Sequence, residues 1–505
     1  MSFASRLPPE LWCIAWETMP FADRVTVSHV SRHWRNIAIF CPLLWTHLDF
    51  FSTVHSSECD CDFCLYEDPI SGEFVHTLND PPGGTNRRLI AHVTRRSGKL
   101  PLSLNMFVGP FSTDMGLLED FATDLCETGA ADRLVSLRIA FDDQDALRSF
   151  LYTLHSLPAL RTIFTEALPL PLEFRRSSDG HPWRNNYIDL PALQHMVLDS
   201  MCWKIILLDD DPSPTTITLP SLQSLVCELT DPEEVRLALD ACPALQSLTV
   251  RVPPYYPNDY DSDAEFAWRL DAATKRRLSE IRRVAVTAVI TVVSERWAIE
   301  NFGGPLQRDV VLHYDTAYIP LHGFAVSRQL GDIHTFAVST TTTRDIGPSF
   351  VCTMVDHTGS RRRIVFSTIH WRACIPRFLA AARPFIASLQ VLQLTAGLVT
   401  HFLSQATPLS SLHTLVIFLG RADDLLLIAD RLTQSLSRAV PSLSAVQLSA
   451  AAGQTVQVPV DVVASLLVCV RGVGPKVLKT LILDGVVLAG DLVVLDRHVA
   501  DTVVM

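Results

Sequence analysis

A short leucine phrase, Leu-x-x-Φ-x-Φ with Φ an apolar residue, returns along this chain and constrains its fold more than any other feature. In several copies a proline stands two residues before the leucine, as in Pro220-Ser221-Leu222. Alternating apolar residues over so short a run are typical of a strand with one buried face. The clear copies begin at Leu134, Leu193, Leu222, Leu245, Leu389, Leu412, Leu443 and Leu478, and the weaker ones at Leu160, Ile281 and Ile333.

The spacing of the phrase predicts how these strands are arranged. Successive leucines from Leu134 to Leu245 lie 26, 33, 29 and 23 residues apart, and those from Leu389 to Leu478 lie 23, 31 and 35 residues apart. These periods overlap and slightly exceed that of leucine-rich repeats, in which each unit supplies one strand and one return helix or loop. One unit cannot bury its own apolar face, so neighbouring units stack. A leucine-rich chain also produces such phrases by chance, but the recurring Pro-x prefix argues against that alternative.

We therefore expect an α/β fold in which residues 46–505 form an irregular leucine-rich-repeat-like solenoid with parallel strands and return helices. The first strand is expected at 45–50, a return helix at 87–97 and the next strand at 100–108. The section 305–372 departs from the phrase. There, an apolar run at 350–355, a turn containing Gly359 and a second apolar run at 361–366 predict a β-hairpin.

Composition limits the partners and the compartment. The 505 residues include 42 Lys and Arg against 54 Asp and Glu, a formal charge of −12, which argues against nucleic acid or an anionic membrane as partner of the whole chain. The longest uncharged apolar stretch, Val284 to Val293, has ten residues, whereas a membrane-spanning helix needs about 20. The first residues do not read as a secretion signal, and 12 cysteines are too few for a disulfide scaffold. We expect a soluble protein of the cytoplasm, the nucleus or both.

The first 45 residues predict three short helices. Pro8 and Pro9 suit the first turn of a helix, which ends before Pro20. Asp23 is expected to cap a second helical stretch that Pro42 ends. In that stretch apolar residues recur at helical spacing, at Val27, Val30, Trp34, Ile37, Ala38 and Cys41. So small a module cannot bury all of its apolar side chains by itself, so they pack either on the following domain or on a partner.

Three blocks of this region resemble an F-box, and the whole chain resembles an F-box protein of the fungal type with a C-terminal leucine-rich-repeat-like domain. The blocks are Leu7-Pro8-Pro9-Glu10-Leu11, Val30-Ser31-Arg32-His33-Trp34-Arg35 and Pro42-Leu43-Leu44-Trp45. An F-box is a short helical module that docks onto the adaptor subunit of a cullin-RING ubiquitin ligase. The resemblance implies that residues 1–45 bind a SKP-type adaptor and through it a cullin.

The resemblance also implies which side chains meet the adaptor. These are Leu7, Pro8, Leu11 and Ile14 at the contact surface, with Val30 and Trp34 at or beneath it. Two features depart from the family pattern. Arg24 stands where the family has a leucine, which places a charge beside the expected apolar contact, and Trp12 and Trp16 are bulkier than usual.

One cluster, His55, Cys59, Cys61 and Cys64, contains residues that can bind a metal ion. Four nitrogen and sulfur donors within ten residues are compatible with Zn²⁺. The cluster is only a weak candidate, because it lacks a second, distant pair of ligands and is interrupted by acidic residues. The default interpretation is an irregular loop at 51–85 without metal.

No nucleotide-binding or hydrolase motif is present in the sequence, so we expect no catalytic residue, no cofactor and no enzymatic activity. Two charge runs remain. The acidic stretch 255–263 is either a solvated loop or a site for a basic segment. The run Arg361-Arg362-Arg363 is either an exposed face or a grip for an acidic or phosphorylated target.

In each phrase, the residues between the two Φ positions face away from the core. This alternation predicts a surface of mixed polarity that suits protein recognition. Its members include the residues expected to bind a target, Arg138, His195, Arg251, Arg283 and Phe418.

The leading hypothesis is a substrate-recognition subunit of an SCF-type ubiquitin ligase, active in protein ubiquitination, whose N-terminal helices bind the adaptor and whose solenoid binds an unknown target protein. One alternative is an adaptor-independent repeat scaffold for protein–protein interaction, in which the helices only cap the solenoid. Another is an enzyme or zinc protein that uses the loop containing Cys59 and Cys64.

Overall fold

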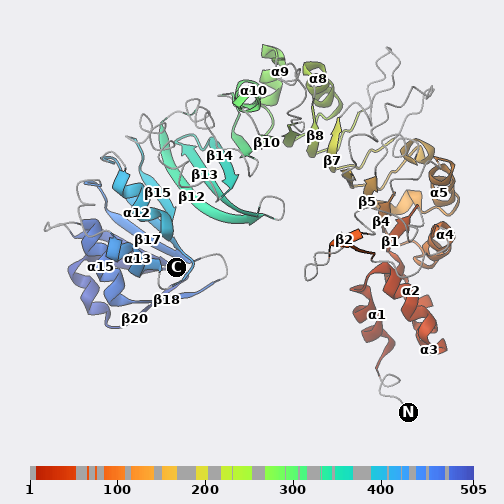
Figure 1. Ribbon diagram of the computed structural model, residues 1–505, viewed down its shortest axis with the longest axis horizontal. Helices are drawn as coiled ribbons and strands as arrows, with labels where there is room; N and C mark the ends of the chain where they lie inside the picture. The colour runs from red at the N-terminus through yellow and green to blue at the C-terminus, as the bar shows by residue number, and fades with distance from the viewer. Residues whose placement is uncertain are drawn as a thin grey trace. The chain divides into compact units, whose positions relative to one another are not determined.

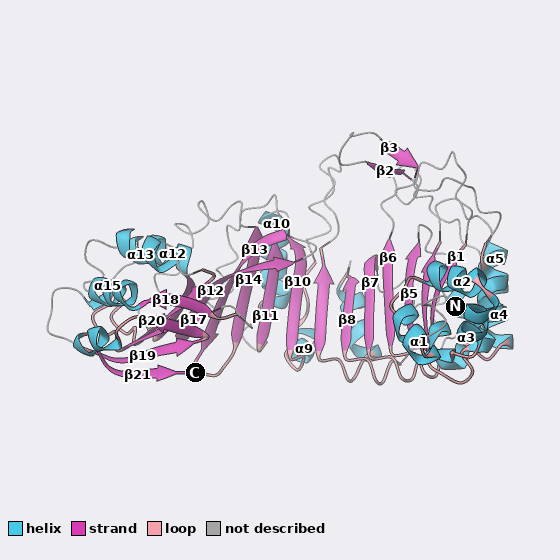
Figure 2. Cartoon of the chain, turned by 90° about the horizontal axis from the view of Figure 1, so that it is seen from below, coloured by secondary structure: helices cyan, strands magenta, loops and turns pink. Residues whose placement is uncertain are grey.

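The computed structural model has an α/β fold: N-terminal helices are followed by a large, mostly parallel sheet of 17 strands (Figures 1 and 2). The expected α/β class is thereby confirmed. By internal contacts the chain divides into two compact units, residues 1–246 and 247–505, and each is described by itself. The structure describes residues 7–52, 65–67, 74–76, 85–108, 115–141, 150–167, 189–202, 218–229, 231–252, 268–289, 292–304, 307–314, 330, 332–343, 347–367, 388–405, 409–421, 424–431, 440–450, 454–471 and 477–505.

Prolines mark the starts of the first two helices, and Pro9 occupies the first position of α1, where proline is favoured. Pro8 stands at the N-cap of α1, and Pro20, not Asp23, stands at the N-cap of α2, so the expected capping role of Asp23 is wrong. The stretch predicted to continue to Pro42 is broken at Ser31, whose backbone is extended (φ −154°) and whose hydroxyl accepts a hydrogen bond from Trp34 N at 3.1 Å. The elements are α1 (Pro9–Glu17), α2 (Phe21–Val30), α3 (Arg32–Ile39) and the 3₁₀ helix η2 (Pro42–Trp45).

Six strands of the first unit follow one another in parallel, in the order β1-β4-β5-β6-β7-β8. Their bounds are β1 (His47–Phe51), β4 (Leu102–Phe107), β5 (Leu134–Phe141), β6 (Thr162–Ala167), β7 (His195–Cys202) and β8 (Ser224–Glu228). The other elements of this unit are α4 (Arg87–Arg96), α5 (Met115–Glu127), η3 (Ala131–Arg133), α8 (Pro232–Ala241) and the small pair β2 (Leu65–Glu67) with β3 (Phe74–His76).

The recurring proline has a defined place: where the phrase carries it, it lies inside a tight turn just before the strand. Leu222 N donates to Leu219 O at 3.2 Å across such a turn, and the intervening Pro220 occupies the position where a fixed φ suits a β-turn. Both leucines are fully buried. Turns of the same kind join Leu157 to Leu160, Leu190 to Leu193, Cys242 to Leu245, Leu409 to Leu412 and Val440 to Leu443.

Successive turns are hydrogen-bonded to one another through the backbone. Gln194 O accepts bonds from both Gln223 N and Ser224 N, at 2.8 and 3.0 Å, and Gln223 O accepts from Gln246 N at 2.9 Å. In the strands that follow, alternate side chains are buried, as the pattern of β8 shows with Leu225 and Cys227 inside. The leucine phrase therefore sets the turn, the register of the strand and the buried face together.

The second unit continues the same pattern with one antiparallel interruption. Its strand order is β9-β10-β11-β14-β13-β12-β15-β16-β17-β19-β21, and only β12–β13 and β13–β14 pair antiparallel. The strands are β9 (Ser247–Arg251), β10 (Arg283–Val289), β11 (Asp309–Tyr314), β12 (Ile333–Thr343), β13 (Gly347–Asp356), β14 (Arg361–Ser367), β15 (Val391–Thr395), β16 (Thr414–Leu419), β17 (Ala445–Ala450), β19 (Leu478–Asp484) and β21 (Val499–Val504). The remaining elements are α9 (Ala272–Leu278), α10 (Val292–Phe302), α12 (Ala396–Gln405), α13 (Asp424–Arg431), α15 (Val460–Arg471), η8 (Leu492–Arg497) and the pair β18 (Val456–Pro459) with β20 (Val486–Ala489).

The turn between β13 and β14 is organised by one carboxylate. Asp356 Oδ1 accepts hydrogen bonds from the backbone N–H groups of Thr358 and Ser360, at 2.8 and 3.0 Å. Gly359 sits at φ +83°, where a side chain would be strained. These bonds reverse the chain within four residues, which explains why this section departs from the parallel pattern.

The arginine run 361–363 divides between two faces of the sheet, because successive strand residues alternate. Arg361 is exposed, whereas Arg362 is fully buried, so the interpretation of the run as a simple exposed face is wrong. The Arg362 guanidinium donates to the carbonyl oxygens of Gln307 (2.9 Å), Gly304 (3.0 Å) and Arg361 (2.9 Å). Burial lowers the pKa of Arg362 to about 10, so it remains charged at neutral pH.

Replacement of this buried arginine tests its structural role. Arg362→Met is expected to lower the free energy of unfolding by about 3 kcal/mol, because a hydrogen bond from a charged donor contributes about 1.5–3 kcal/mol and the released carbonyl oxygens stay buried. Arg361→Met, one residue away and exposed, is the matched control, expected to change stability by less than about 0.5 kcal/mol. Chemical denaturation measures both variants, and equal stabilities would contradict the assignment.

Candidate functional site

Helix α1 and the residue before its N-cap leave apolar side chains exposed. Leu7, Leu11 and Ile14, spaced four and three residues apart, keep 43%, 50% and 63% of their surface in contact with solvent. Pro8 is exposed beside them. Leu11 and Ile14, three residues apart in α1, share one face of the helix. With Leu7 they form an exposed apolar strip at the place where the resemblance predicts adaptor contact.

Val30 and Trp34 lie differently from one another. Val30, the last residue of α2, is 61% exposed, whereas Trp34 is half-buried. The Trp34 ring contacts the rings of Trp12 and Trp16, at centroid distances of 5.1 and 5.4 Å, and the last two stack at 5.5 Å. The two bulky residues that depart from the family pattern therefore join Trp34 in one aromatic cluster between α1 and α3.

Arg24 does not place a charge on the apolar strip, so that expectation is wrong. Its side chain is buried, with 4% of its surface exposed. The two terminal nitrogens donate to the carbonyl oxygens of Leu44 and His47, at 2.5 and 2.7 Å, and the guanidinium carbon lies 5.7 Å from the centre of the Phe21 ring. Burial lowers the pKa of Arg24 below its usual range. Arg24 thus joins α2 to η2 and to the start of β1.

Trp45, like Arg24, joins the N-terminal helices to the α/β part of the first unit. Trp45 is buried and its indole N–H donates to Ala38 O at 2.8 Å. On its other side the Arg96 guanidinium from α4 lies 5.2 Å from the Trp45 ring. The Pro-x-Leu-Trp block is therefore the joint between the helices and the α/β part.

Two exposed apolar residues of this region were not among the predicted contacts. Phe40, which follows α3, is 83% exposed, and Leu43 in η2 is 50% exposed. The helical spacing pattern pointed to Cys41, which is buried, and not to its neighbour Phe40. Phe40 and Cys41 differ in exposure because α3 ends at Ile39. The spacing pattern did not predict that end.

The residues expected to bind a target are divided between the two units. In the first unit, Arg138 on β5 and His195 on β7 are exposed on the same face, with β6 between them. Arg138 donates to Glu166 at 2.7 Å, and its guanidinium lies 5.0 Å from the Phe164 ring.

In the second unit, the three remaining candidates do not form one site. Arg251 and Arg283 lie on neighbouring strands, but the Cα partner of Arg251 is Thr287, four residues from Arg283. Phe418, half-buried on β16, is separated from them by several strands.

Arg283 instead lies in a group of charged residues that the sequence did not predict. Its Cα partner on β11 is Asp309, whose carboxylate accepts a hydrogen bond from Arg363 at 2.6 Å. On the same strand, burial and the charges of Arg283 and Arg363 lower the pKa of His313 to about 4. At neutral pH the imidazole of His313 is therefore uncharged.

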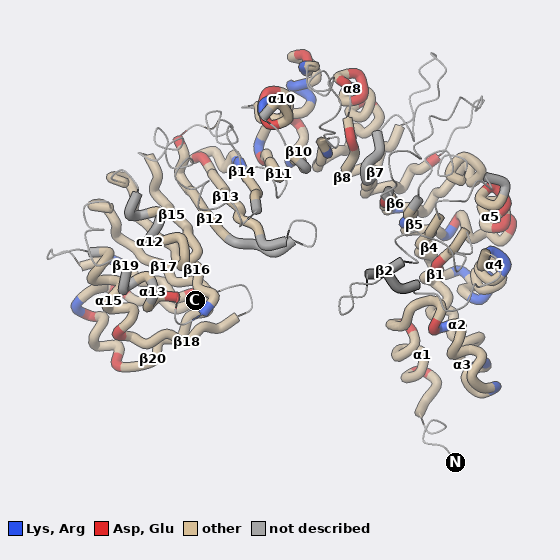
Figure 3. The backbone as a smooth tube through the Cα atoms, in the orientation of Figure 1, with Lys and Arg blue, Asp and Glu red and all other residues tan. Residues whose placement is uncertain are grey.

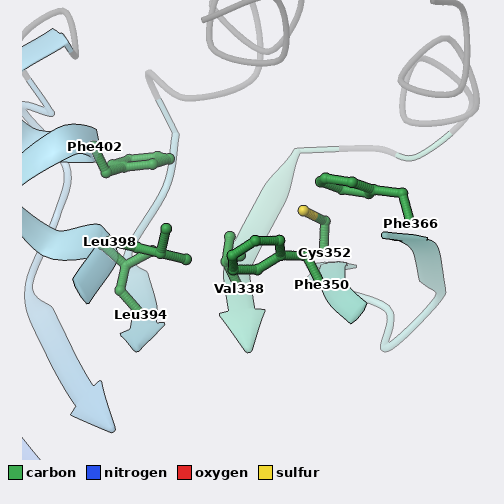
Figure 4. A pocket seen from close by; sticks show the side chains of 7 residues that line it. All are labelled: Val338, Phe350, Cys352, Phe366, Leu394, Leu398 and Phe402. Carbon is green, nitrogen blue, oxygen red and sulfur yellow. The ribbon is translucent and has the colours of Figure 1, made fainter. Parts of the chain in front are cut away.

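A small hollow in the second unit has only apolar walls (Figure 4). Strands β12, β13, β14 and β15 supply one side, and Leu398 and Phe402 of α12 supply the other. Cys352 contributes the one sulfur atom, and each lining side chain is at most 6% exposed. The lining residues offer no carboxylate, imidazole or amine. The hollow is therefore a gap in the packing beneath α12. It is lined by Val338, Phe350, Cys352, Phe366, Leu394, Leu398 and Phe402.

The zinc candidates His55, Cys59, Cys61 and Cys64 lie outside the described residues, as does the acidic stretch at 255–263. Within the described ranges, no group of three or more His, Cys, Asp or Glu side chains is arranged to hold a metal ion. None of the helices in the described part of the chain combines the length and the apolar character that crossing a bilayer requires.

Comparison with known proteins gives a match for the N-terminal helices. No curated protein matches the chain. F-box domains typically bind a SKP-type adaptor and through it a cullin, which fits an exposed apolar strip on a helical module. The family model of the F-box domain matches residues 4–46, so the chain carries an F-box domain in the helices that hold this strip.

Proposed function

We propose that this chain is the substrate-recognition subunit of an SCF-type ubiquitin ligase. In this proposal, the strip formed by Leu7, Leu11 and Ile14 binds the SKP-type adaptor and the α/β part binds a target protein. The observation that supports it most directly is the solvent exposure of this strip within the matched F-box domain. Burying a leucine or isoleucine side chain contributes about 1.5–3 kcal/mol, so the strip has a strong tendency to bind an apolar partner surface.

The proposed role involves no covalent chemistry by this chain. A ligase receptor acts by holding the target near the charged conjugating enzyme, which raises the effective concentration of target lysines. The proposed compartment is the cytoplasm or the nucleus, where such an assembly would meet its targets.

We also propose that the α/β part is a leucine-rich-repeat-like solenoid. The support comes from the recurring turn, in which a buried leucine such as Leu222 precedes the strand, and from the backbone bonds that join successive turns such as those before β7, β8 and β9. Because each repeat bonds mainly to its neighbours, such an array presents an extended face for protein recognition. In the first unit, Arg138 and His195 lie on that face.

Adaptor binding is tested by charging the exposed strip. Leu11→Asp/Ile14→Asp is expected to weaken adaptor binding more than a hundredfold, because two buried apolar contacts of about 1.5–3 kcal/mol each are replaced by buried carboxylates. The matched control is Leu426→Asp on α13, which charges a leucine of similar exposure (44%) in the second unit. Calorimetry with purified adaptor measures all three proteins, and absence of binding by the wild type would favour the adaptor-independent scaffold.

Arg24→Leu tests whether Arg24 belongs to the adaptor contact surface or is a buried structural residue. The variant restores the leucine of the family pattern, but it leaves the carbonyl oxygens of Leu44 and His47 without their donor. We expect a loss of about 2–4 kcal/mol in stability and no gain in adaptor affinity. A variant that bound the adaptor more tightly at unchanged stability would show that Arg24 belongs to the contact surface.

Target binding is tested with Arg138→Glu, which changes the charge of an exposed residue on β5. In cells, ubiquitinated proteins that depend on an intact Leu11 are the candidate targets. At least some of them are expected to lose ubiquitination with Arg138→Glu and to keep it with Arg282→Glu, a charge reversal at an exposed site in the second unit. If every such protein were unaffected by Arg138→Glu, this part of the face would have no role in recognition.

A further inference from the structure

Helix α4 carries an unusual concentration of positive charge for a chain with a net charge of −12. Residues 85–99 include five Arg and Lys and no Asp or Glu. Four side chains of this segment, here called the basic stripe, are exposed: Arg88, His92, Arg95 and Lys99. Figure 3 shows α4 in blue beside the F-box helices, with the red acidic residues of α5 on its other side.

Two of the five charges have structural partners. Arg87 donates to Asp124 at 2.5 Å and to Asp120 at 2.5 Å, both on α5. Arg96 packs over Trp45 and donates to His92 Nε2 at 2.9 Å. By contrast, Arg88, Arg95 and Lys99 form no ion pair with any residue in the part of the chain that the structure describes.

Folding stability explains only part of the stripe. Arg95 lies in the last turn of α4, where the helix dipole favours a positive charge, but Arg88 lies in the first turn, where the dipole disfavours it. A solvated helix face normally mixes both signs, whereas the exposed charges of this face are all positive. An acidic partner would therefore be attracted along the whole stripe.

The stripe is held rigidly against the F-box domain. Ile90 and Val93, on the opposite face of α4, are buried. At the end of the helix, the Arg133 guanidinium donates to Thr94 O at 3.1 Å and to Ser97 Oγ at 2.9 Å. The contact of Arg96 with Trp45 connects the same helix to η2 of the F-box domain. Arg88 and Arg95 are therefore fixed about two helical turns, or about 10 Å, apart.

The neighbourhood favours a protein over a polyanion as the partner. Glu119, Asp120 and Glu127 are exposed on α5, which packs beside α4. A nucleic acid or an anionic membrane covering α4 would also meet these carboxylates and be repelled. A narrow acidic segment of a folded partner can contact the stripe without meeting them.

From these observations we propose that the basic stripe is a second contact for the adaptor assembly, which binds an acidic protein segment on the helix that packs against η2 of the F-box domain. This inference rests on the proposed function, since the same partner is engaged. The apolar strip supplies most of the binding free energy, and the stripe steers association and fixes orientation, as charges at the rim of an interface do.

The test uses the full-length chain and a purified complex of SKP-type adaptor and cullin. Arg88→Glu/Arg95→Glu is expected to raise Kd about tenfold or more at low ionic strength, mainly through slower association. The difference from wild type is expected to shrink as salt is raised, because exposed charges are screened beyond about 10 Å at 0.1 M salt. Arg88→Gln/Arg95→Gln should show an intermediate effect.

The control is Arg276→Glu/Arg282→Glu, which makes the same change of charge at two exposed arginines of the second unit. It is expected to leave Kd and its salt dependence near the wild-type values, and thermal unfolding checks that all variants are folded. Wild-type affinity for Arg88→Glu/Arg95→Glu, or an equal loss for the control, overturns the stripe as a specific contact while leaving the proposed function intact.

Two further outcomes also overturn the proposal. If the wild type does not bind the adaptor complex at all, both this inference and the proposed function fail. If a 20-nucleotide RNA or DNA binds the wild type, and Arg88→Glu/Arg95→Glu abolishes that binding without changing adaptor affinity, the stripe serves a polyanion instead.

Discussion

The fold depends on one repeated connection, the backbone bonds from each pre-strand turn to the turn before it. Each turn places a leucine inside, and its backbone bonds to the neighbouring turn, as Gln194 O does by accepting from two N–H groups after the next turn. Because one repeat cannot bury its own apolar face, neighbouring repeats stabilise each other. This connection determines the strand register, and the register determines which side chains are exposed as possible contacts.

Three arginines join segments that the strand ladder does not connect. Arg24 and Arg362, which are buried, and Arg133, which is half-buried, each donate to at least two backbone carbonyl oxygens. A guanidinium has five donors in a planar arrangement, so a single side chain can bond several strand or helix ends. In this chain, some of the positive charge is therefore structural.

Sequence reasoning was most successful where periodicity governs the structure. The α/β class and the F-box domain were predicted because an apolar repeat and three ordered blocks are properties of the chain itself. Arg24 was misjudged because its role depends on carbonyl oxygens 20 and 23 residues away, which no local pattern encodes. The group of Arg283, Asp309 and Arg363 was missed for a similar reason, since β14 lies beside β11 only because the hairpin reverses the chain. The stripe on α4 was visible in the sequence, but its importance follows only from knowing which of its charges lack partners.

The placement of the turns also affects how such a chain can change over time. The leucines that begin the phrases are 23 to 35 residues apart, yet the strands keep a parallel register. The register is set at the turns and not by the length of the connections. Insertions and deletions between one strand and the next turn thus leave the ladder intact, so evolution can vary connection length without rebuilding the core.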